Sequence, residues 1–222
     1  MTLLELRTLI RQRANMENSQ FVTDAELTNY VNASYAELYD LLVSRFEDYF
    51  IQDPYQFTLT NSVSKAALPS DFYKLRGVDL QLNSPTDWVS VSQYNFAERN
   101  TRKLNQARYG NFVSYRVLGS NIQVMPAESA AGTYQLWYIP RIVKLENDSD
   151  SLTGVMDFEE YIVVDAAIKC LIKEESETSV LLAVKEQLRQ RILTMSSSRD
   201  AGTPERVGDV YGLSSMDELF PR

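Results

Sequence analysis

The sequence contains no histidine and a single cysteine, Cys170, among its 222 residues. Without histidine the chain cannot build a Ser-His-Asp triad or a Cys-His pair, so these forms of nucleophilic catalysis are excluded. One cysteine also rules out a disulfide framework and a cysteine-based zinc site. Because Cys170 falls in an apolar stretch, we predict that it is a small buried hydrophobic residue.

Long apolar runs and positive charge are also scarce. No run approaches the roughly 18 apolar residues of a membrane span, and the opening MTLLELRTLIRQR lacks the apolar core and cleavage site of a secretion signal. We therefore expect a protein made and kept in a cytoplasm, with no membrane partner. Lys and Arg number 22 against 30 Asp and Glu, so the net charge is −8. This acidity argues against coating of nucleic acid, which uses Lys and Arg to displace counterions from phosphates.

The clearest element that the sequence does contain is a helix over Val22–Phe46. Thr23 is a good N-cap, and Glu26 three residues later completes a capping box. Val22 can pack on Leu27 in a hydrophobic staple. Apolar and aromatic residues then recur at helical spacing, so one face of this helix needs a partner from the rest of the chain.

Three other segments have helical patterns. The first is Thr2–Ala14, which a short polar loop joins to the long helix, so the two are expected to form a hairpin. Phe158–Ile172 is apolar on most faces, which indicates a helix buried nearly all round. We expect Asp157 to cap it, with Glu160 in the box position. A last helix is expected to begin at Ser179.

Between these helices the pattern becomes that of β-strands. Gly119-Ser120 is predicted to form a tight hairpin turn, and Pro69-Ser70-Asp71 a helical turn that continues through Phe72 and Tyr73. Alternating apolar and polar residues predict the following strands: Tyr55–Thr60, Val63–Leu68, Leu75–Leu82, Trp88–Val91, Val113–Val117, Asn121–Met125 and Thr133–Ile139.

These elements predict an α+β fold in which N-terminal and C-terminal helices form a helical bundle, with an antiparallel β-rich middle part and an extended C-terminal tail. The expected parts are an N-terminal helix hairpin (1–50), the β-rich domain (51–145), a C-terminal helix hairpin that completes the helical domain (146–197) and the tail (198–222). The tail is rich in small, polar and helix-breaking residues. Its apolar residues are expected to be ordered only against another chain: Val210, Tyr211, Leu213, Met216, Leu219 and Phe220.

The one sizeable positive cluster lies between Glu98 and Arg116. It has five cations against one acid, a net charge of +4: Arg99, Arg102, Lys103, Arg108 and Arg116. This cluster either binds a partner, which would be nucleic acid or an acidic protein, or is an ordinary solvated surface. Tyr94, Phe96 and Tyr109 lie beside it, and aromatic residues next to cations can stack on bases. For Phe96 and Tyr109 we favour core or interface positions.

Acids are concentrated around the third long helix. The segment contains two lysines, Lys169 and Lys173, and seven acidic residues. The acidic residues are Asp157, Glu159, Glu160, Asp165, Glu174, Glu175 and Glu177. Glu159 and Glu160 could hold a metal for phosphodiester cleavage. Adjacent helix positions point about 100° apart, however, and the sequence has no Gly-rich phosphate loop. The acids of the loop at 146–150 do not complete an EF-hand. We therefore expect no enzyme activity, no metal and no cofactor.

Three stretches, in this order, carry a resemblance to a known family. They are LRTLIRQRAN…FVTDAELTNYVNASYAELYDLL, then ALPSDFYKLRGVDL, then YQLWYIPRIVKL followed after a loop by FEEYIVVDAAIKCLIKEE. The chain resembles the head-to-tail adaptor (connector) proteins of tailed bacteriophages, including the tail tubular protein A group. The stretches cover most of Leu3–Glu175, and none is a catalytic signature.

The resemblance implies a structural protein of the virion neck or tail region, assembled in the host cytoplasm. Twelve copies would form a ring under the portal protein, with the helical part on the portal and the β part toward tail nozzle or tail fibre proteins. DNA would pass through the middle without sequence-specific binding, and no catalytic residue is implied. The acidic net charge agrees with such a conduit, because a lumen that repels phosphate does not retain DNA.

A closed ring joins two different faces of neighbouring subunits. We therefore expect the basic cluster to meet the acidic helix of the next subunit, and the apolar tail to dock on the portal or on a neighbour. The alternatives are a nucleic-acid-binding module that uses residues 99–116 and a metal-dependent carboxylate hydrolase. The predicted subunit-interface residues are Arg99, Arg102, Lys103, Arg108, Arg116, Glu159, Glu160, Glu174 and Glu175.

Overall fold

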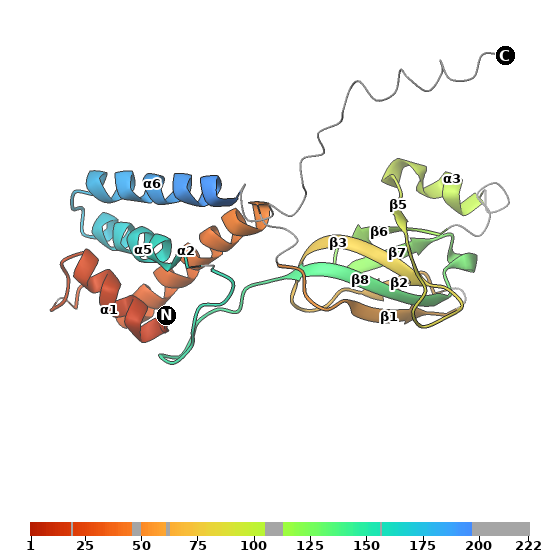
Figure 1. The fold of residues 1–222 in the computed structure, drawn as a ribbon, viewed down its shortest axis with the longest axis horizontal. Coiled ribbons are helices and arrows are strands. Elements are labelled where there is room, and N and C mark those ends of the chain that lie inside the picture. The colour runs from red at the N-terminus through yellow and green to blue at the C-terminus, as the bar shows by residue number, and fades with distance from the viewer. Residues whose placement is uncertain (19, 46–49, 61–62, 105–112, 156, 197–222) are drawn as a thin grey trace, which may run out of the picture.

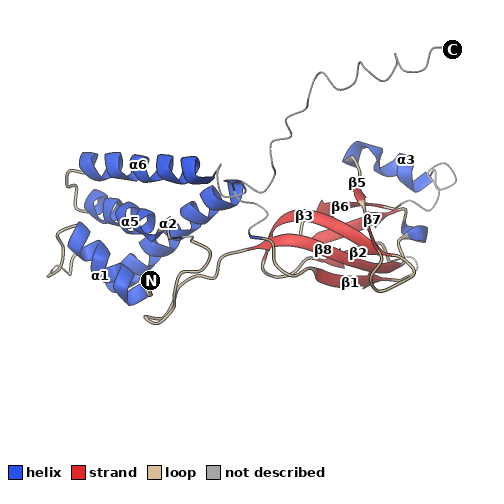
Figure 2. Cartoon of the chain, in the orientation of Figure 1, coloured by secondary structure: helices blue, strands red, loops and turns tan. Residues whose placement is uncertain are grey.

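The long helices gather on one side of the protein, and the two β-sheets lie on the other together with the short helix α3 (Arg99–Leu104) (Figure 1). Figure 2 shows the same separation by secondary structure, and it confirms the predicted α+β class. The predicted tail over residues 198–222 lies outside the described part of the chain. The computed structural model describes residues 1–18, 20–45, 50–60, 63–104, 113–155 and 157–196.

Helices from the two ends of the described chain pack together. α2 (Asp24–Arg45) contacts α5 (Glu159–Lys173), and α1 (Leu3–Arg13) lies against both. α6 (Ser179–Ser196) packs on α5 and on α2. Residues far apart in the sequence therefore build one group of helices.

Capping boxes begin the first two helices, as their sequences predict. The Thr23 amide donates to Glu26 Oε2 at 2.9 Å, and the Glu26 amide donates to Thr23 Oγ1 at 3.3 Å. Thr2 and Glu5 make the same reciprocal pair at the start of α1. Each box satisfies amides that would otherwise lack partners in the first helical turn.

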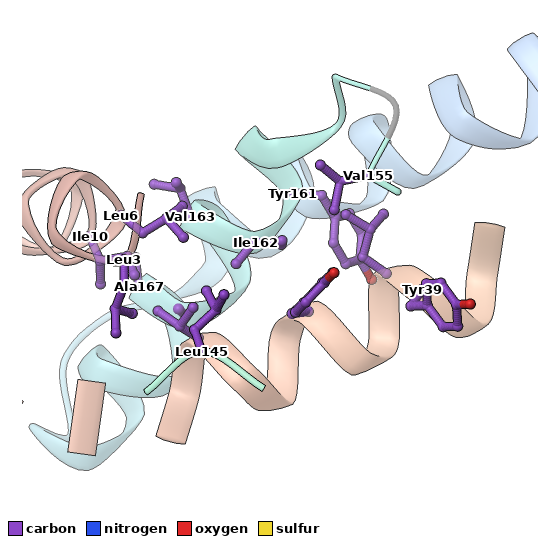
Figure 3. Close-up of a cluster of buried hydrophobic side chains, with 14 of the residues drawn as sticks. Leu3, Leu6, Ile10, Tyr39, Leu145, Val155, Tyr161, Ile162, Val163 and Ala167 are labelled. Carbon is purple, nitrogen blue, oxygen red and sulfur yellow. The ribbon is translucent and has the colours of Figure 1, made fainter. Parts of the chain in front are cut away.

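α5 is the centre of the first hydrophobic core. Nine of its 15 residues are buried, which confirms the predicted helix buried nearly all round. Figure 3 shows Val163 and Ala167 of α5 among Leu3 and Leu6 of α1. Cys170 is 1% exposed, as predicted, and burial raises the pKa of its thiol to about 11. A thiol with so high a pKa is unreactive at neutral pH.

The two sheets each contain four strands in the described residues. The strand order is β1-β8-β3-β4 in one sheet and β2-β7-β6-β5 in the other. The bounds are β1 Tyr55–Leu59, β2 Lys65–Ala67, β3 Phe72–Gln81, β4 Trp88–Ser90, β5 Ser92–Gln93, β6 Ser114–Leu118, β7 Asn121–Met125 and β8 Gly132–Pro140.

The strand pairing is antiparallel except at one edge. β6 and β7 form the predicted hairpin, and Gly119 occupies its turn with a φ of 61°, a conformation that glycine adopts at little cost. The two-residue strand β5 pairs with β6 in parallel, which differs from the fully antiparallel expectation.

A second hydrophobic core belongs to the sheets. The Phe57 and Tyr134 rings stack with centroids 5.3 Å apart, on neighbouring strands β1 and β8. Ile122 and Val124 of the other sheet are fully buried in the same cluster. The sheets thus have a core distinct from that of the helices.

Aromatic residues connect the helices to the sheets. The Tyr39 hydroxyl of α2 donates to the Pro140 carbonyl at the end of β8, over 2.8 Å. The Tyr39 ring also meets Phe50 edge-on, with centroids 5.1 Å apart. The Tyr73 hydroxyl of β3 donates to Asp40 of α2 at 2.6 Å.

Two local predictions are wrong. Asp157 has a φ of 66°, and α5 begins after Phe158 without a side-chain cap, because this backbone turn takes Asp157 out of the N-cap position. The expected helical turn through Phe72 and Tyr73 is instead the start of β3, where Phe72 pairs with Pro140. Pairing with a distant strand overrides the local preference there.

Candidate interaction surfaces

An exposed aromatic ring lies close to two cations at the sheet side of the molecule. Phe96, in the short 3₁₀-helix Phe96–Glu98, is 43% exposed. The guanidinium carbon of Arg99 lies 4.5 Å from its ring centroid and that of Arg116 lies 5.8 Å away. We call these three residues the Phe96 cluster. Such cation–π contacts hold the guanidinium groups over the ring faces.

The surroundings of the Phe96 cluster are ordered by polar contacts. Arg116 of β6 donates to the Tyr94 carbonyl at 2.9 Å, and the Asn95 side chain accepts from the Ala97 amide. Tyr94 itself is 1% exposed, and its burial raises the pKa of its hydroxyl. The exposure of Phe96 shows that it is not a core residue, so the expectation of a core position was wrong. The other expectation, that Phe96 lies in an interface, stays a prediction.

The structure describes only part of the rest of the predicted basic cluster. α3 (Arg99–Leu104) follows directly after the 3₁₀-helix and carries Arg102 and Lys103. Arg108 and Tyr109, which the sequence places in the same segment, lie outside the described residues. The structure thus brings Arg99 and Arg116 together around Phe96.

The predicted acidic surface is divided by contacts within the chain. Glu159 accepts a hydrogen bond of 2.7 Å from the N-terminal ammonium group of Met1, and Glu160 forms an ion pair with Arg13. The two adjacent carboxylates therefore have different partners and do not converge on one point. Glu174 and Glu175 follow the last turn of α5 and are exposed.

Asp165 is not part of the acidic surface, because it lies inside the helices at 3% exposed. Its carboxylate accepts from Lys185 of α6 at 2.8 Å and from Lys169 one turn along α5. Burial raises the pKa of the Asp165 carboxyl, but the hydrogen bonds from Lys169 and Lys185 outweigh that effect and hold the pKa below its usual value. Lys169 also donates to Ser34 of α2, so the charged Asp165 side chain is part of a network that joins three helices.

Lys185 extends this network to α2. Its ammonium also lies 2.8 Å from Glu37, and the Tyr161 hydroxyl donates to the same Glu37 oxygen at 2.7 Å. Burial lowers the pKa of Lys185, but the bonds to Asp165 and Glu37 raise it above its usual value. α6 is thus held to α2 and α5 by paired charges as well as by apolar contacts.

A groove of about 380 Å³ lies where α2 meets β3 and the chain after β8. Asn32 fixes one wall by a reciprocal pair of hydrogen bonds with the Leu145 backbone, at 2.8 and 2.9 Å. The lining combines apolar groups with two cations and one acid: Asn32, Ala36, Tyr39, Asp40, Tyr73, Arg141, Ile142 and Lys144. We call this site the junction groove.

A comparison with protein families matches residues 1–208 to the SU10 adaptor protein family. The chain belongs to this family of phage adaptor proteins. The match confirms the resemblance to phage head-to-tail adaptors and supports a structural role. A comparison of the sequence with curated proteins gives no match.

The described part of the adaptor shows no group of three or more acids or cysteines placed to hold a metal ion. In the same residues, no helix has the length and apolar character required to cross a membrane.

Sequence reasoning missed two features of the adaptor. The network around Asp165 joins residues more than 100 positions apart, and the junction groove is formed by three separate segments. A charged residue in the middle of an otherwise apolar helix was the one signal for the network, because such a residue is seldom buried without partners. No pattern in the sequence indicates the groove.

Proposed function

We propose that the adaptor joins the portal of a phage capsid to its tail, as a ring of about twelve copies around the path of the DNA. The observation that carries this proposal is the family match, which spans residues 1–208 and so includes every described helix and strand. An adaptor family implies contacts with portal and tail components and association of its copies, and a place in the virion neck.

The distribution of helices and sheets supports a protein with two working ends. The helical core and the sheet core are separate clusters of buried residues, and the parts meet at Tyr39, Phe50 and Tyr73. We propose that residues 1–50 and 146–197 form the portal-binding part. Residues 51–145 form the part that faces tail nozzle or tail fibre proteins, and the segment after 197 docks on a portal or a neighbouring copy.

Ring closure requires that two different surfaces of the subunit meet. The Phe96 cluster is a positive surface on the sheet side, whereas Glu174 and Glu175 lie at the end of α5 among the helices (Figure 1). We propose that these two surfaces pair between subunits. This pairing requires the sheets of one subunit to lie beside the helices of the next.

The negative net charge of the chain also supports the part of the proposal that concerns passage of DNA. The chain carries −8 overall, and a lumen with a negative field repels phosphate instead of binding it. We therefore expect the assembled ring to let duplex DNA pass without retaining it at physiological salt.

One observation favours a second function. Phe96 is exposed and flanked by Arg99 and Arg116, an arrangement in which a nucleic-acid base can stack on the ring while phosphates meet the cations. A nucleic-acid-binding module is therefore the alternative. The carboxylate hydrolase has less support, because Glu159 and Glu160 pair with Met1 and Arg13.

Binding assays separate these functions. The adaptor is mixed with purified portal and, separately, with labelled single- and double-stranded DNA at two salt concentrations. The proposal predicts sedimentation with the portal and weak DNA binding, unchanged by Phe96→Ala. Tight, salt-dependent DNA binding that Phe96→Ala abolishes, without portal binding, would replace it by the alternative.

A further inference from the structure

The junction groove has a preformed apolar floor and an unsatisfied positive rim. The Tyr39 and Tyr73 rings are held in place by their hydroxyl bonds to Pro140 and Asp40. Lys144 is exposed and makes no hydrogen bond or ion pair within the described residues. Sites of this size, with an apolar lining and a few fixed polar groups, are typical of places that bind a side chain or a small ligand.

Arg141 adds a second cation with free donors. Its backbone amide and its Nε donate to the carbonyls of Asp71 and Phe72, at 2.6 and 3.0 Å, which fixes the base of the side chain. Its two terminal nitrogens make no hydrogen bond or ion pair within the described part of the chain. Asp40, the one acid of the lining, already accepts from Tyr73. The groove therefore favours an occupant that is apolar and carries negative charge.

The chain contains a segment with this character. Residues 216–220 read Met-Asp-Glu-Leu-Phe, two acids followed by two large apolar side chains. They lie beyond residue 208, where the family match ends, so the family does not account for them. We propose that this segment of one copy binds the junction groove of a neighbouring copy, with Leu219 and Phe220 on the floor and Asp217 and Glu218 near Lys144 and Arg141.

The length of the chain allows this contact. About 20 residues separate Ser196, at the end of α6, from Asp217, and an extended chain of that length spans up to about 65 Å. α2 is only about 33 Å long, from its 22 residues. The segment is therefore long enough to pass the full length of α2, so chain length does not confine it to its own subunit.

The position of α6 favours a neighbour over the same chain. Lys185 of α6 bonds to Glu37, whereas Asn32, Ala36 and Tyr39 of the groove lie on another side of α2. Of the α2 residues that line the groove, Asp40 also lines the cleft next to α6. A segment that follows α6 would have to turn around α2 to enter its own groove. The inference rests on the proposed function, because a ring supplies the adjacent copy.

The first test is binding of a fluorescent peptide of residues 212–222 to the full chain, measured by anisotropy. Lys144→Glu should weaken binding about five- to tenfold, because an attraction becomes a repulsion. The same variant should recover affinity for a peptide that carries Glu218→Lys. The matched control is Lys65→Glu, on the exposed strand β2, which should bind as the wild type does.

The second test identifies the chain that supplies the segment. Val143, 78% exposed beside the groove, and Ser215 are each replaced by cysteine, in separate full-length chains and in one double variant. After mixing and mild oxidation, the proposal predicts a disulfide between two chains. Cys170 is buried and should not compete.

The proposal is overturned if no peptide binding occurs, if Lys144→Glu and Lys65→Glu bind the peptide equally, or if the disulfide forms only within one chain. The mass of the portal-bound particle is measured on the same preparations. A ring of normal mass without peptide binding overturns the groove assignment alone, whereas absence of a ring from wild-type protein counts against the proposed function.

Discussion

Lys185 and Asp165 form an ion pair at 2.8 Å that connects α6 to the middle of α5. Asp165 is one of the few buried polar residues among the described positions, and its carboxylate is shared by two lysines. A buried charge that loses its partners is costly, so this network decides how firmly the last described helix is held.

Replacement of Asp165 should destabilise the helices. Asp165→Ala leaves Lys169 and Lys185 without their shared carboxylate and should lower the free energy of unfolding by about 3 kcal/mol. Urea titration followed by circular dichroism at 222 nm measures this change. The control is Glu186→Gln, which removes a half-exposed pair with Arg189 on the same α6 and should cost less than about 0.5 kcal/mol. Equal effects would show that the Asp165 network carries no special weight.

The two hydrophobic cores should respond differently to the same substitution. Both tryptophans lie in strands, Trp88 in β4 and Trp137 in β8, so tryptophan fluorescence reports on the sheets. Asp165→Ala should move the transition at 222 nm to lower urea and move the fluorescence transition less. Transitions that shift together would mean that helices and sheets unfold as one unit, against the proposed division of the chain.

Acid should weaken the contact between α2 and α5. Glu26 accepts from Lys173 at 2.7 Å and from the Thr23 amide, and these bonds lower the pKa of its carboxyl from 4.5 to about 2. Since the folded pKa is the lower one, the unfolded chain binds more protons between about pH 2 and 4.5, and stability is lost as the pH falls through that window.

Glu26→Gln is the variant that checks this. The urea midpoint of the wild type should fall between pH 5 and pH 3, and that of Glu26→Gln should fall less, because one of the carboxylates with a lowered pKa is gone. Glu17→Gln, an exposed change in the loop before α2, should follow the wild-type curve. If the urea midpoint of Glu26→Gln fell with pH as much as that of the wild type, Glu26 would not be a cause of the acid sensitivity.

Several helices, strands and turns could be predicted from local sequence patterns. The alternation in Tyr55–Thr60 and the Gly119 turn led to β1 and to the β6–β7 hairpin, and the Thr23 box marks the start of α2. These features depend on neighbouring residues. Where distant partners decide, prediction failed: Phe72 pairs with Pro140, and the groove needs α2, β3 and the chain after β8. Of the predicted interface residues, Arg99 and Arg116 lie close to the same Phe96 ring, whereas Glu159 and Glu160 are paired within the chain.

The proposed contact between subunits is electrostatic, and charge reversal should break it. Arg102→Glu with Lys103→Glu adds negative charge to α3 beside the Phe96 cluster and should prevent ring formation at physiological salt. Glu174→Lys with Glu175→Lys in the same chain should restore it in part. Lys65→Glu serves again as the control, and gel filtration in the presence of portal gives the readout. Rings that form normally from the α3 variant would refute the pairing.

The mass of the native particle, measured on the adaptor alone and with purified portal, is the decisive test of ring assembly. Portal-bound adaptor is expected to have the mass of a closed ring, about twelve times that of the 25.4 kDa chain. A particle that carries single chains, or an adaptor that stays monomeric when portal is present, would contradict it.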